Sequence, residues 1–250
     1  MQLIYGIHPL SESLRQQAAR RIEKIFIAKN KKIKSIQEIL NLASREKIPV
    51  FFKERNELDG LTNRKFHQGV IGFCKDYVYA SIDDVIANCH EALRGKSLVL
   101  VLDSITDPQN LGSLIRVAHC CGANGIVIPE NRAASVTDAV MKASAGALQY
   151  LPVAMVKNLS VAIEYLKEKG FWIYGADIGS KHLIHRIDYE DHVAVVVGSE
   201  GKGIRSLVKK KCDFLVSIPM LGKVESFNVS VASGIILHEI LRHSNNLGLP

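Results

Sequence analysis

The sequence predicts an α/β protein of two domains: a small module at residues 1–75 and a larger parallel α/β domain at 96–250, joined by a linker at 76–95. From Ser97 onward, apolar runs of strand length alternate with helical patterns, as in a parallel sheet that has helices on both sides. The preceding segment, KDYVYASIDDVIANCHEALRGK, carries mixed and polar residues, which indicates a boundary between domains.

The first module alternates short strand-like and helix-like patterns. The segment SIQEILNLASREK (35–47) places Ile36, Ile39, Leu40 and Ala43 at the spacing of an amphipathic helix. Four apolar runs predict strands, LIYGI (3–7), IEKIFIA (22–28), IPVFF (48–52) and GVIGFC (69–74). These elements predict a compact α/β module.

The second domain contains apolar runs without polar alternation, which is typical of strands buried on both faces of a parallel sheet. The intervening helical patterns include NLGSLIRVAHCCG (110–122) and SVAIEYLKEKG (160–170). Because ligands of such sheets bind at the carboxyl ends of the strands, residues that follow the strands are the candidates for function. The runs are SLVLVLDSI, GIVIP, LPVAMV, FWIYGAD, VAVVVG and FLVSIP.

The net charge of +7 is unevenly distributed. Residues 1–75 hold 15 Lys and Arg against 7 Asp and Glu, whereas residues 76–250 hold 17 against 18. A charged segment is commonly only a solvated face. An excess confined to one module nevertheless favours contact with nucleic acid, RNA or DNA.

Composition narrows the class of protein. The chain has 250 residues, 47% of them hydrophobic, and no apolar run comes near the roughly 18 residues of a membrane span. Its first residues, MQLIYGIHPLSESLRQQAARR, lack the layout of an export signal. The five cysteines form no C-x-x-C pair, and neither they nor the nine histidines have zinc-ligand spacing. We therefore expect a cytoplasmic protein with reduced thiols and no metal site.

A glycine-rich turn follows one predicted strand. In VVVGSEGKGI (195–204), three glycines are interleaved with Glu200 and Lys202. Their spacing fits neither a P-loop nor a G-x-G-x-x-G dinucleotide site, and Glu200 would repel a phosphate. Two interpretations stay open: the turn brings backbone close to another kind of ligand, or the glycines only satisfy positive φ angles.

A second strand end is followed by LDSITDPQNLGSLIRVA. Asp107 and Pro108 suit the N-cap and first position of a helix. That helix would place Arg116 about 140° from the middle of its buried stripe, and Asn110 in its first turn. On pattern alone, Arg116 is a solvated side chain or the ion-pair partner of Glu200, and Asn110 is a first-turn hydrogen-bonding residue.

The third stretch is SIPMLGKVESFNVSVASGIILHEIL (217–241). We expect its strand to end at Ile218–Met220 and a helix to begin near Ser226 or Asn228, both of which are good N-caps. The small residues of this helix suit close packing, either against a partner chain or within one subunit.

The three stretches together match one family in order and spacing. LDSITDPQNLGSLIRVAHCCGANGIVI, VVVGSEGKGI and IPMLGKVESFNVSVASGIILHE resemble the three motifs of the SpoU/TrmH branch of SPOUT methyltransferases. Those enzymes transfer a methyl group from S-adenosyl-L-methionine to a ribose 2′-hydroxyl of tRNA or rRNA. YGIHPLSESLR and RKFHQGVIGF also resemble the ribosomal-protein-like RNA-binding domain of many members. The overall layout is most similar to bacterial members that methylate a guanosine of 23S rRNA.

The resemblance implies a C-terminal segment threaded into a deep trefoil knot, against the usual rule for chains, and a homodimer with each active site near the two-fold interface. It implies that the S-adenosyl-L-methionine site is formed by Gly198, Ile218, Met220 and Phe227, where Phe227 stands in place of the family's leucine. The catalytic residues that it implies are Asn110, Arg116, Glu200, Ser226 and Asn228.

The resemblance gives Arg116 the central role. Because a guanidinium holds its proton strongly, we expect Arg116 to grip the nucleotide's phosphate and position the hydroxyl, with action as a base as the alternative. Glu200 would orient Arg116, and the remaining three would hydrogen-bond the hydroxyl and the loop. Phosphates of the RNA are expected to contact Arg20, Arg21, Lys24, Lys29, Lys31, Lys32 and Lys34.

Two other classes compete with this interpretation: a non-catalytic RNA-binding factor for ribosome assembly, and a nucleotide-binding α/β enzyme. The first should have lost the polar residues at the strand ends, yet all five are present. The second should carry a phosphate loop, and the sequence has none. The same chemistry on tRNA stays an alternative to rRNA.

Overall fold

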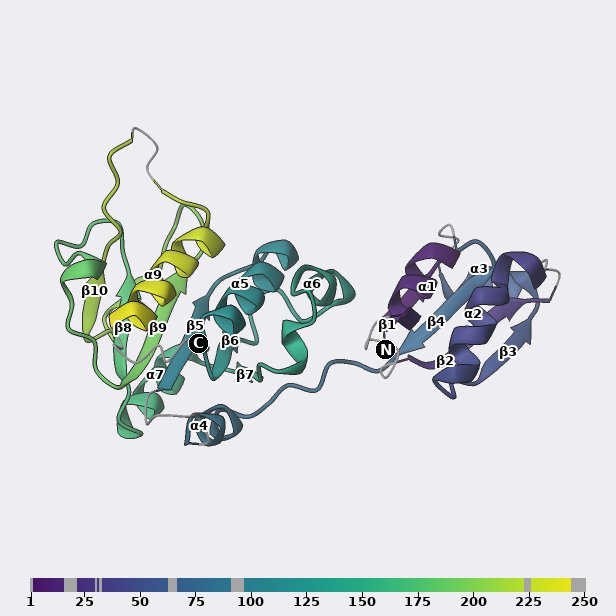
Figure 1. The fold of residues 1–250 in the computed structure, drawn as a ribbon, viewed down its shortest axis with the longest axis horizontal. Helices are drawn as coiled ribbons and strands as arrows, with labels where there is room; N and C mark the ends of the chain where they lie inside the picture. Colours follow the sequence, from purple (N-terminus) through teal and green to yellow (C-terminus); the bar gives the residue numbers. More distant parts are fainter. Residues whose placement is uncertain are drawn as a thin grey trace. The chain divides into compact units, whose positions relative to one another are not determined.

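The structure is a computed structural model that describes residues 2–15, 22–29, 31, 33–62, 67–90, 97–222 and 226–243. The chain divides into two compact units, Met1–Val78 and Tyr79–Pro250 (Figure 1). The expected linker at 76–95 contains a helix, α4 (Ile82–His90), which packs on strands of the second unit. Val85 and Ile86 of α4 are buried in the core of the second unit. The helix therefore belongs to that unit, which begins at Tyr79, and the mixed composition of the segment did not indicate this apolar face.

The first unit is a four-stranded sheet with helices on both faces. Strands β2 (Ile22–Ala28) and β3 (Val50–Lys53) are parallel, and the other two pairs of neighbouring strands are antiparallel. Helices α1 (Ile7–Arg15) and α2 (Ile33–Arg45) pack on one face, and α3 (Arg55–Leu61) packs on the other. The predicted amphipathic helix is confirmed as α2, whose Ile36, Ile39 and Ala43 are fully buried. In spatial order the strands are β1 (Gln2–Tyr5), β4 (Val70–Cys74), β2 (Ile22–Ala28) and β3 (Val50–Lys53).

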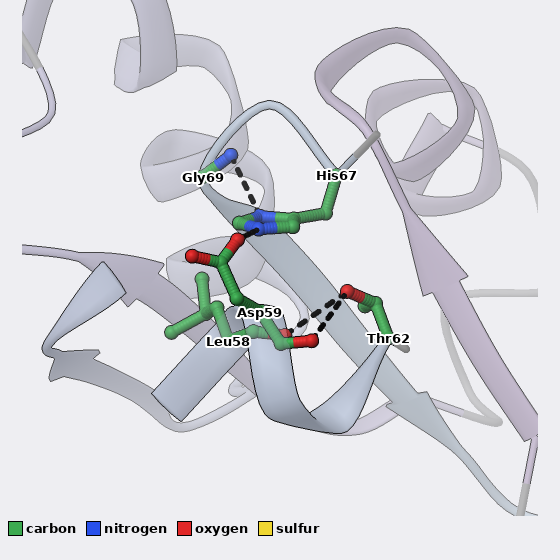
Figure 2. A network of polar contacts seen from close by, with 5 residues as sticks. All are labelled: Leu58, Asp59, Thr62, His67 and Gly69. Carbon is green, nitrogen blue, oxygen red and sulfur yellow. Dashed lines mark hydrogen bonds and ion pairs between the residues drawn. The ribbon is translucent and has the colours of Figure 1, made fainter. Parts of the chain in front are cut away.

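A buried histidine ties the end of α3 to the start of β4 (Figure 2). The Nδ1 of His67 accepts a hydrogen bond from the backbone N–H of Gly69 at 3.0 Å, so the proton is on Nε2. Nε2 in turn donates to Oδ1 of Asp59 at 2.8 Å. Next to His67, the side-chain oxygen of Gln68 accepts from the backbone N–H of Ile7 at 2.9 Å. The HQG segment of RKFHQGVIGF thus fixes the connection between α3, β4 and α1.

The second unit contains a six-stranded parallel sheet, as the six apolar runs predicted. The central strands are buried on both faces, which explains their lack of polar alternation. In spatial order they are β10 (Phe214–Val216), β8 (Trp172–Ala176), β9 (His192–Gly198), β5 (Ser97–Asp103), β6 (Gly125–Pro129) and β7 (Val153–Val156).

Helices cover both faces of this sheet (Figure 1). One face carries α4, α7 (Leu159–Glu168) and α8 (Ser206–Lys209), whose apolar side chains share one core with the strands. Helix α5 (Pro108–Cys120) packs with α6 (Asp138–Ala143) and α9 (Val229–His243) on the other side. Short 3-10 turns lie at Ala147–Gln149 and Ile184–Arg186. Among the helices described, none has the length and apolar character needed to cross a membrane.

The small residues of α9 let it approach α5 within one chain. A Cβ added at Gly234 would lie 3.4 Å from Cγ1 of Val117 on α5. Ser233 is fully buried and its hydroxyl donates to the carbonyl of Val229 at 2.7 Å. Ile236 and Leu237 are also buried within the subunit. These residues therefore stabilise the α5–α9 packing of a single chain.

Candidate active site

A pocket opens at the carboxyl ends of β8, β9 and β10. All four residues predicted to bind the cofactor line it, and Glu200 and Ser226 lie in the same lining. The expected strand end at Ile218–Met220 is wrong, because β10 ends at Val216. The polypeptide leaves the sheet where Ser217 donates its backbone N–H to the carbonyl of His182, and the loop that follows supplies one wall of the pocket. The four residues are Gly198, Ile218, Met220 and Phe227.

The glycine turn closes on itself beside this pocket. The N–H of Gly203 donates to the carbonyl of Ser199 at 2.8 Å, and Gly201 and Gly203 have φ values of 79° and 63°. A Cβ added at Gly198 would lie 2.0 Å from the carbonyl carbon of Gly203. Gly201 and Gly203 therefore provide the left-handed conformation, as the second interpretation expected, and Gly198 permits a close approach of the turn's own backbone. An approach of this backbone to a ligand stays a prediction.

Three of the five predicted catalytic residues form one hydrogen-bonded cluster at the rim of the pocket. Oε1 of Glu200 accepts from Nδ2 of Asn110 at 3.3 Å, from Nδ2 of Asn228, and from the backbone N–H of Val229 at 3.3 Å. Nδ2 of Asn228 also lies 3.1 Å from Oδ1 of Asn110. The cluster brings Asn110 together with residues 90 and 118 positions later in the sequence, whereas Glu200 and Asn228 are 28 residues apart.

Local helix starts place these side chains. Asp107 caps α5 by accepting from the N–H of Gln109 at 3.0 Å, and Pro108 follows as the first helical residue, as predicted. Asn228 precedes α9 and accepts from the N–H of Ser230 at 3.0 Å. Of the two N-caps considered for α9, the structure therefore uses Asn228. Its amide group remains available to Glu200 and Asn110.

Arg116 lies apart from the cluster. It is exposed on α5, six residues beyond Asn110, which corresponds to about 9 Å along the helix and about 240° around it. Within the part of the chain that the structure describes, no hydrogen bond or ion pair joins Arg116 to Glu200, whose recorded partners are the two asparagines and Val229. Ser226 is exposed in the pocket lining.

Sequence reasoning missed a buried ion pair beneath the glycine turn. Asp103 is fully buried at the end of β5, and its carboxylate accepts from Nε of Arg205 at 2.6 Å and from the backbone N–H of Arg205 at 2.8 Å. The signal was an aspartate closing an apolar run, since a buried carboxylate needs a partner. The pair anchors the far end of the turn to the central strand of the sheet.

The predicted RNA-contacting residues of the first unit are only partly described, because Arg20, Arg21 and Lys32 lie outside the described residues. Lys24 lies over the ring of Phe73, 4.9 Å from its centroid, and Lys29 pairs with Glu54 at 2.8 Å. Across the described residues, no group of three or more His, Cys, Asp or Glu side chains is arranged to hold a metal ion.

Two models of known protein families match this chain. The model of the SpoU rRNA Methylase family matches residues 97–238. The model named RNA 2′-O ribose methyltransferase substrate binding matches residues 3–80. The two matches correspond to the two units of the fold.

Relatives match this chain over nearly their whole length. YacO of Bacillus subtilis, assigned to the TrmH family of tRNA/rRNA methyltransferases, is 39% identical over 98% of this chain and 97% of its own length. The 23S rRNA (guanosine-2′-O-)-methyltransferase RlmB of Coxiella burnetii is 38% identical over 96% of this chain and 94% of its own.

Solved structures share the fold. The SpoU methyltransferase AviRb from Streptomyces viridochromogenes, in complex with AdoMet, superposes with a TM-score of 0.71 at 22% identity, covering 98% of this chain and 90% of that one. The A. aeolicus TrmH/SpoU tRNA modifying enzyme has a TM-score of 0.57 at 24% identity, over 67% of this chain and 84% of its own. The chain therefore belongs to the SpoU family of RNA methyltransferases, as its three motifs predicted.

Proposed function

We propose that this protein methylates a ribose 2′-hydroxyl of structured RNA with S-adenosyl-L-methionine as methyl donor, and that its substrate is a guanosine of 23S rRNA. The observation that carries the proposal is the Asn110–Glu200–Asn228 cluster at the rim of a pocket lined by Gly198, Ile218, Met220 and Phe227. The choice of 23S rRNA is supported by the likeness to RlmB over nearly the whole chain.

The residues that line the pocket suit the proposed cofactor in polarity and charge. Ile218, Met220 and Phe227 offer apolar surface to an adenosine, and the backbone of Gly198 lies in the same lining. The carboxylate of Glu200 in the lining complements the positive sulfonium and amino groups of the cofactor, and a second carboxylate there, that of Asp177, pairs with Lys209 at 2.7 Å. When bound, S-adenosyl-L-methionine supplies the methyl group.

Glu200 fixes the positions of the other polar groups of the site. By accepting from Asn110, Asn228 and the N–H of Val229, its carboxylate fixes the starts of α5 and α9 relative to the glycine turn. With the two amides held, Asn110, Asn228 and Ser226 orient the ribose hydroxyl and the loop by hydrogen bonds. This replaces the expected role of Glu200 as the group that orients Arg116.

Arg116 positions the substrate through a phosphate of the target nucleotide, and it acts as a base only if its environment is strongly perturbed. We expect Arg116→Ala to abolish methyl transfer while affinity for S-adenosyl-L-methionine stays close to that of the wild type. Calorimetry beside a transfer assay measures both. Normal turnover by the variant would remove Arg116 from the mechanism.

The first unit docks the RNA through its excess of positive charge.

Two copies of the chain form a homodimer. A dimer interface on α9 needs residues that are exposed in one chain, and Val231 on this helix is 50% exposed. Val231→Asp is expected to shift the protein to monomers in sedimentation without unfolding it. Val161→Asp, at a 64% exposed valine on α7, is the control. A monomeric wild type at micromolar concentration would exclude the dimer. The trefoil knot stays a prediction of the resemblance.

The decisive experiment is transfer of radiolabelled methyl groups to total RNA from cells that lack this protein, followed by mapping of the labelled ribose. Label on a guanosine of 23S rRNA is the expected result. Label on tRNA would support the alternative substrate, which the family name of YacO keeps open. No label on any RNA would contradict the proposed activity.

A further inference from the structure

A second groove lies at the carboxyl edge of the same sheet, away from the cofactor pocket. It is formed where β6 and β7 end, beside the first turn of α7 and the short helix α8. Its walls include Pro129 at the end of β6 and Asn158 at the N-cap of α7. Neither the family motifs nor the proposed mechanism uses it.

The groove is lined by four cationic side chains and, among the described residues, by no carboxylate. Two of the cations already have partners, since Arg205 pairs with buried Asp103 and Lys211 pairs with Glu164 at 2.7 Å. The other two, Arg132 and Lys157, are exposed, and within the described residues they have no ion pair. Such a lining suits an anion.

Arg132 is held in an unusual backbone conformation. Its φ is 62°, in the left-handed region that residues other than glycine rarely adopt. Backbone strain of this kind persists where the surrounding structure fixes it, and it concentrates at functional sites. Here it directs an exposed arginine from the loop after β6 into the lining of the groove. The N-terminal end of α7 adds a partial positive charge beside Lys157.

The groove and the candidate active site are connected through the glycine turn. Glu200, at the start of the turn, belongs to the catalytic cluster, whereas Arg205, just after it, lines the groove. Strand β5 alone separates β9 from β6 in the sheet, so the carboxyl ends of β9 and β6 lie about 10 Å apart at the spacing of neighbouring strands. The pocket lies on the α9 side of this edge and the groove on the α7–α8 side. An RNA strand that crosses this edge of the sheet would therefore reach both.

We propose that this groove binds a phosphodiester of the substrate RNA next to the target nucleotide, through Arg132 and Lys157. This inference rests on the proposed function and adds a contact on the second unit to the docking by the first. The groove would fix the position of the strand without reading its sequence, since phosphate contacts carry no base information.

The test compares RNA binding of full-length variants over a salt series, without cofactor, on 23S rRNA transcribed in vitro. For Arg132→Ala and Lys157→Ala, we expect the negative slope of log K against log salt to become less steep, by roughly 0.7 to 0.9 for each phosphate contact removed. In the transfer assay, KM for RNA should rise while kcat at saturating RNA and affinity for S-adenosyl-L-methionine are kept. Lys157→Arg should restore the slope.

The matched control is Lys169→Ala, at the opposite end of α7 and outside the groove. It should leave slope and KM unchanged. Unchanged binding and slope in the Arg132 and Lys157 variants would overturn the proposal, as would a loss of kcat at constant KM. If inorganic phosphate binds the wild type but not the variants, while the slope for RNA stays the same, the groove takes a free anion and the proposal fails. A wild type that binds the RNA but transfers no methyl group would contradict the proposed function and leave the binding test of the groove intact.

Discussion

Gly198→Ala tests the close approach at the base of the glycine turn. The added Cβ would lie 2.0 Å from C of Gly203, 2.1 Å from its O and 2.2 Å from N of Ile204. All three are backbone atoms, so no side chain can rotate to relieve the overlap. The turn between Gly198 and Gly203 must open by more than an ångström to restore ordinary contact distances.

The free energy of unfolding should fall by about 3 kcal/mol or more. Overpacking in a well-packed region costs roughly 1–3 kcal/mol, and occasionally more, when neighbouring atoms can shift. Opening the turn also breaks the bond from the N–H of Gly203 to the carbonyl of Ser199, which contributes about 0.5–1.5 kcal/mol. It displaces Glu200, so the cluster with Asn110 and Asn228 loses its common acceptor.

Urea denaturation followed by circular dichroism measures the stability, and calorimetry measures the affinity for S-adenosyl-L-methionine, which should fall by more than tenfold. The control is Gly201→Ala in the same turn, where an added Cβ meets nothing within 4 Å but φ is 79°. That variant should lose only about 1–2 kcal/mol, the cost of a left-handed alanine. If Gly198→Ala has an unfolding free energy within about 0.5 kcal/mol of the wild type, a range ordinary for surface substitutions, and binds the cofactor normally, the reasoning is wrong.

Three further outcomes are expected. Asp103→Asn should lower the free energy of unfolding in urea by about 1–3 kcal/mol, because the buried carboxylate accepts two charge-assisted or backbone bonds from Arg205; an unchanged midpoint would contradict this. Burial raises the pKa of Cys212 to about 12, so at about pH 8 it stays a thiol and should resist iodoacetamide while exposed Cys120 is alkylated; mass spectrometry that finds Cys212 modified first would refute the assignment. A fragment of residues 79–250 should fold and bind cofactor yet methylate RNA poorly, whereas 96–250 should be less stable because it lacks α4; equal thermal stability of the two fragments would show that α4 adds nothing.

Much of the fold was predictable because its patterns are local. The six apolar runs predicted a parallel sheet, and Asp107 with Pro108 predicted the start of α5, since strand burial and helix capping depend on a few adjacent residues. The helix α4 was not predicted. Its buried apolar residues, Val85 and Ile86, stand among polar residues in the sequence, and their burial becomes apparent only where they pack against the strands of the second unit.

The family and most residues of the site were predictable from the sequence, because Gly198, Glu200 and Asn228 have recognisable types at characteristic spacing. The contacts among these residues could be assigned only from the folded chain. It placed Glu200 with the two asparagines and apart from Arg116, and it paired Asp103 with Arg205 across 102 residues. A hydrogen bond requires a separation near 3 Å between its two heavy atoms. Whether two distant residues come that close depends on the order of strands in the sheet and on the rotation of each helix about its axis, and a local sequence pattern predicts neither.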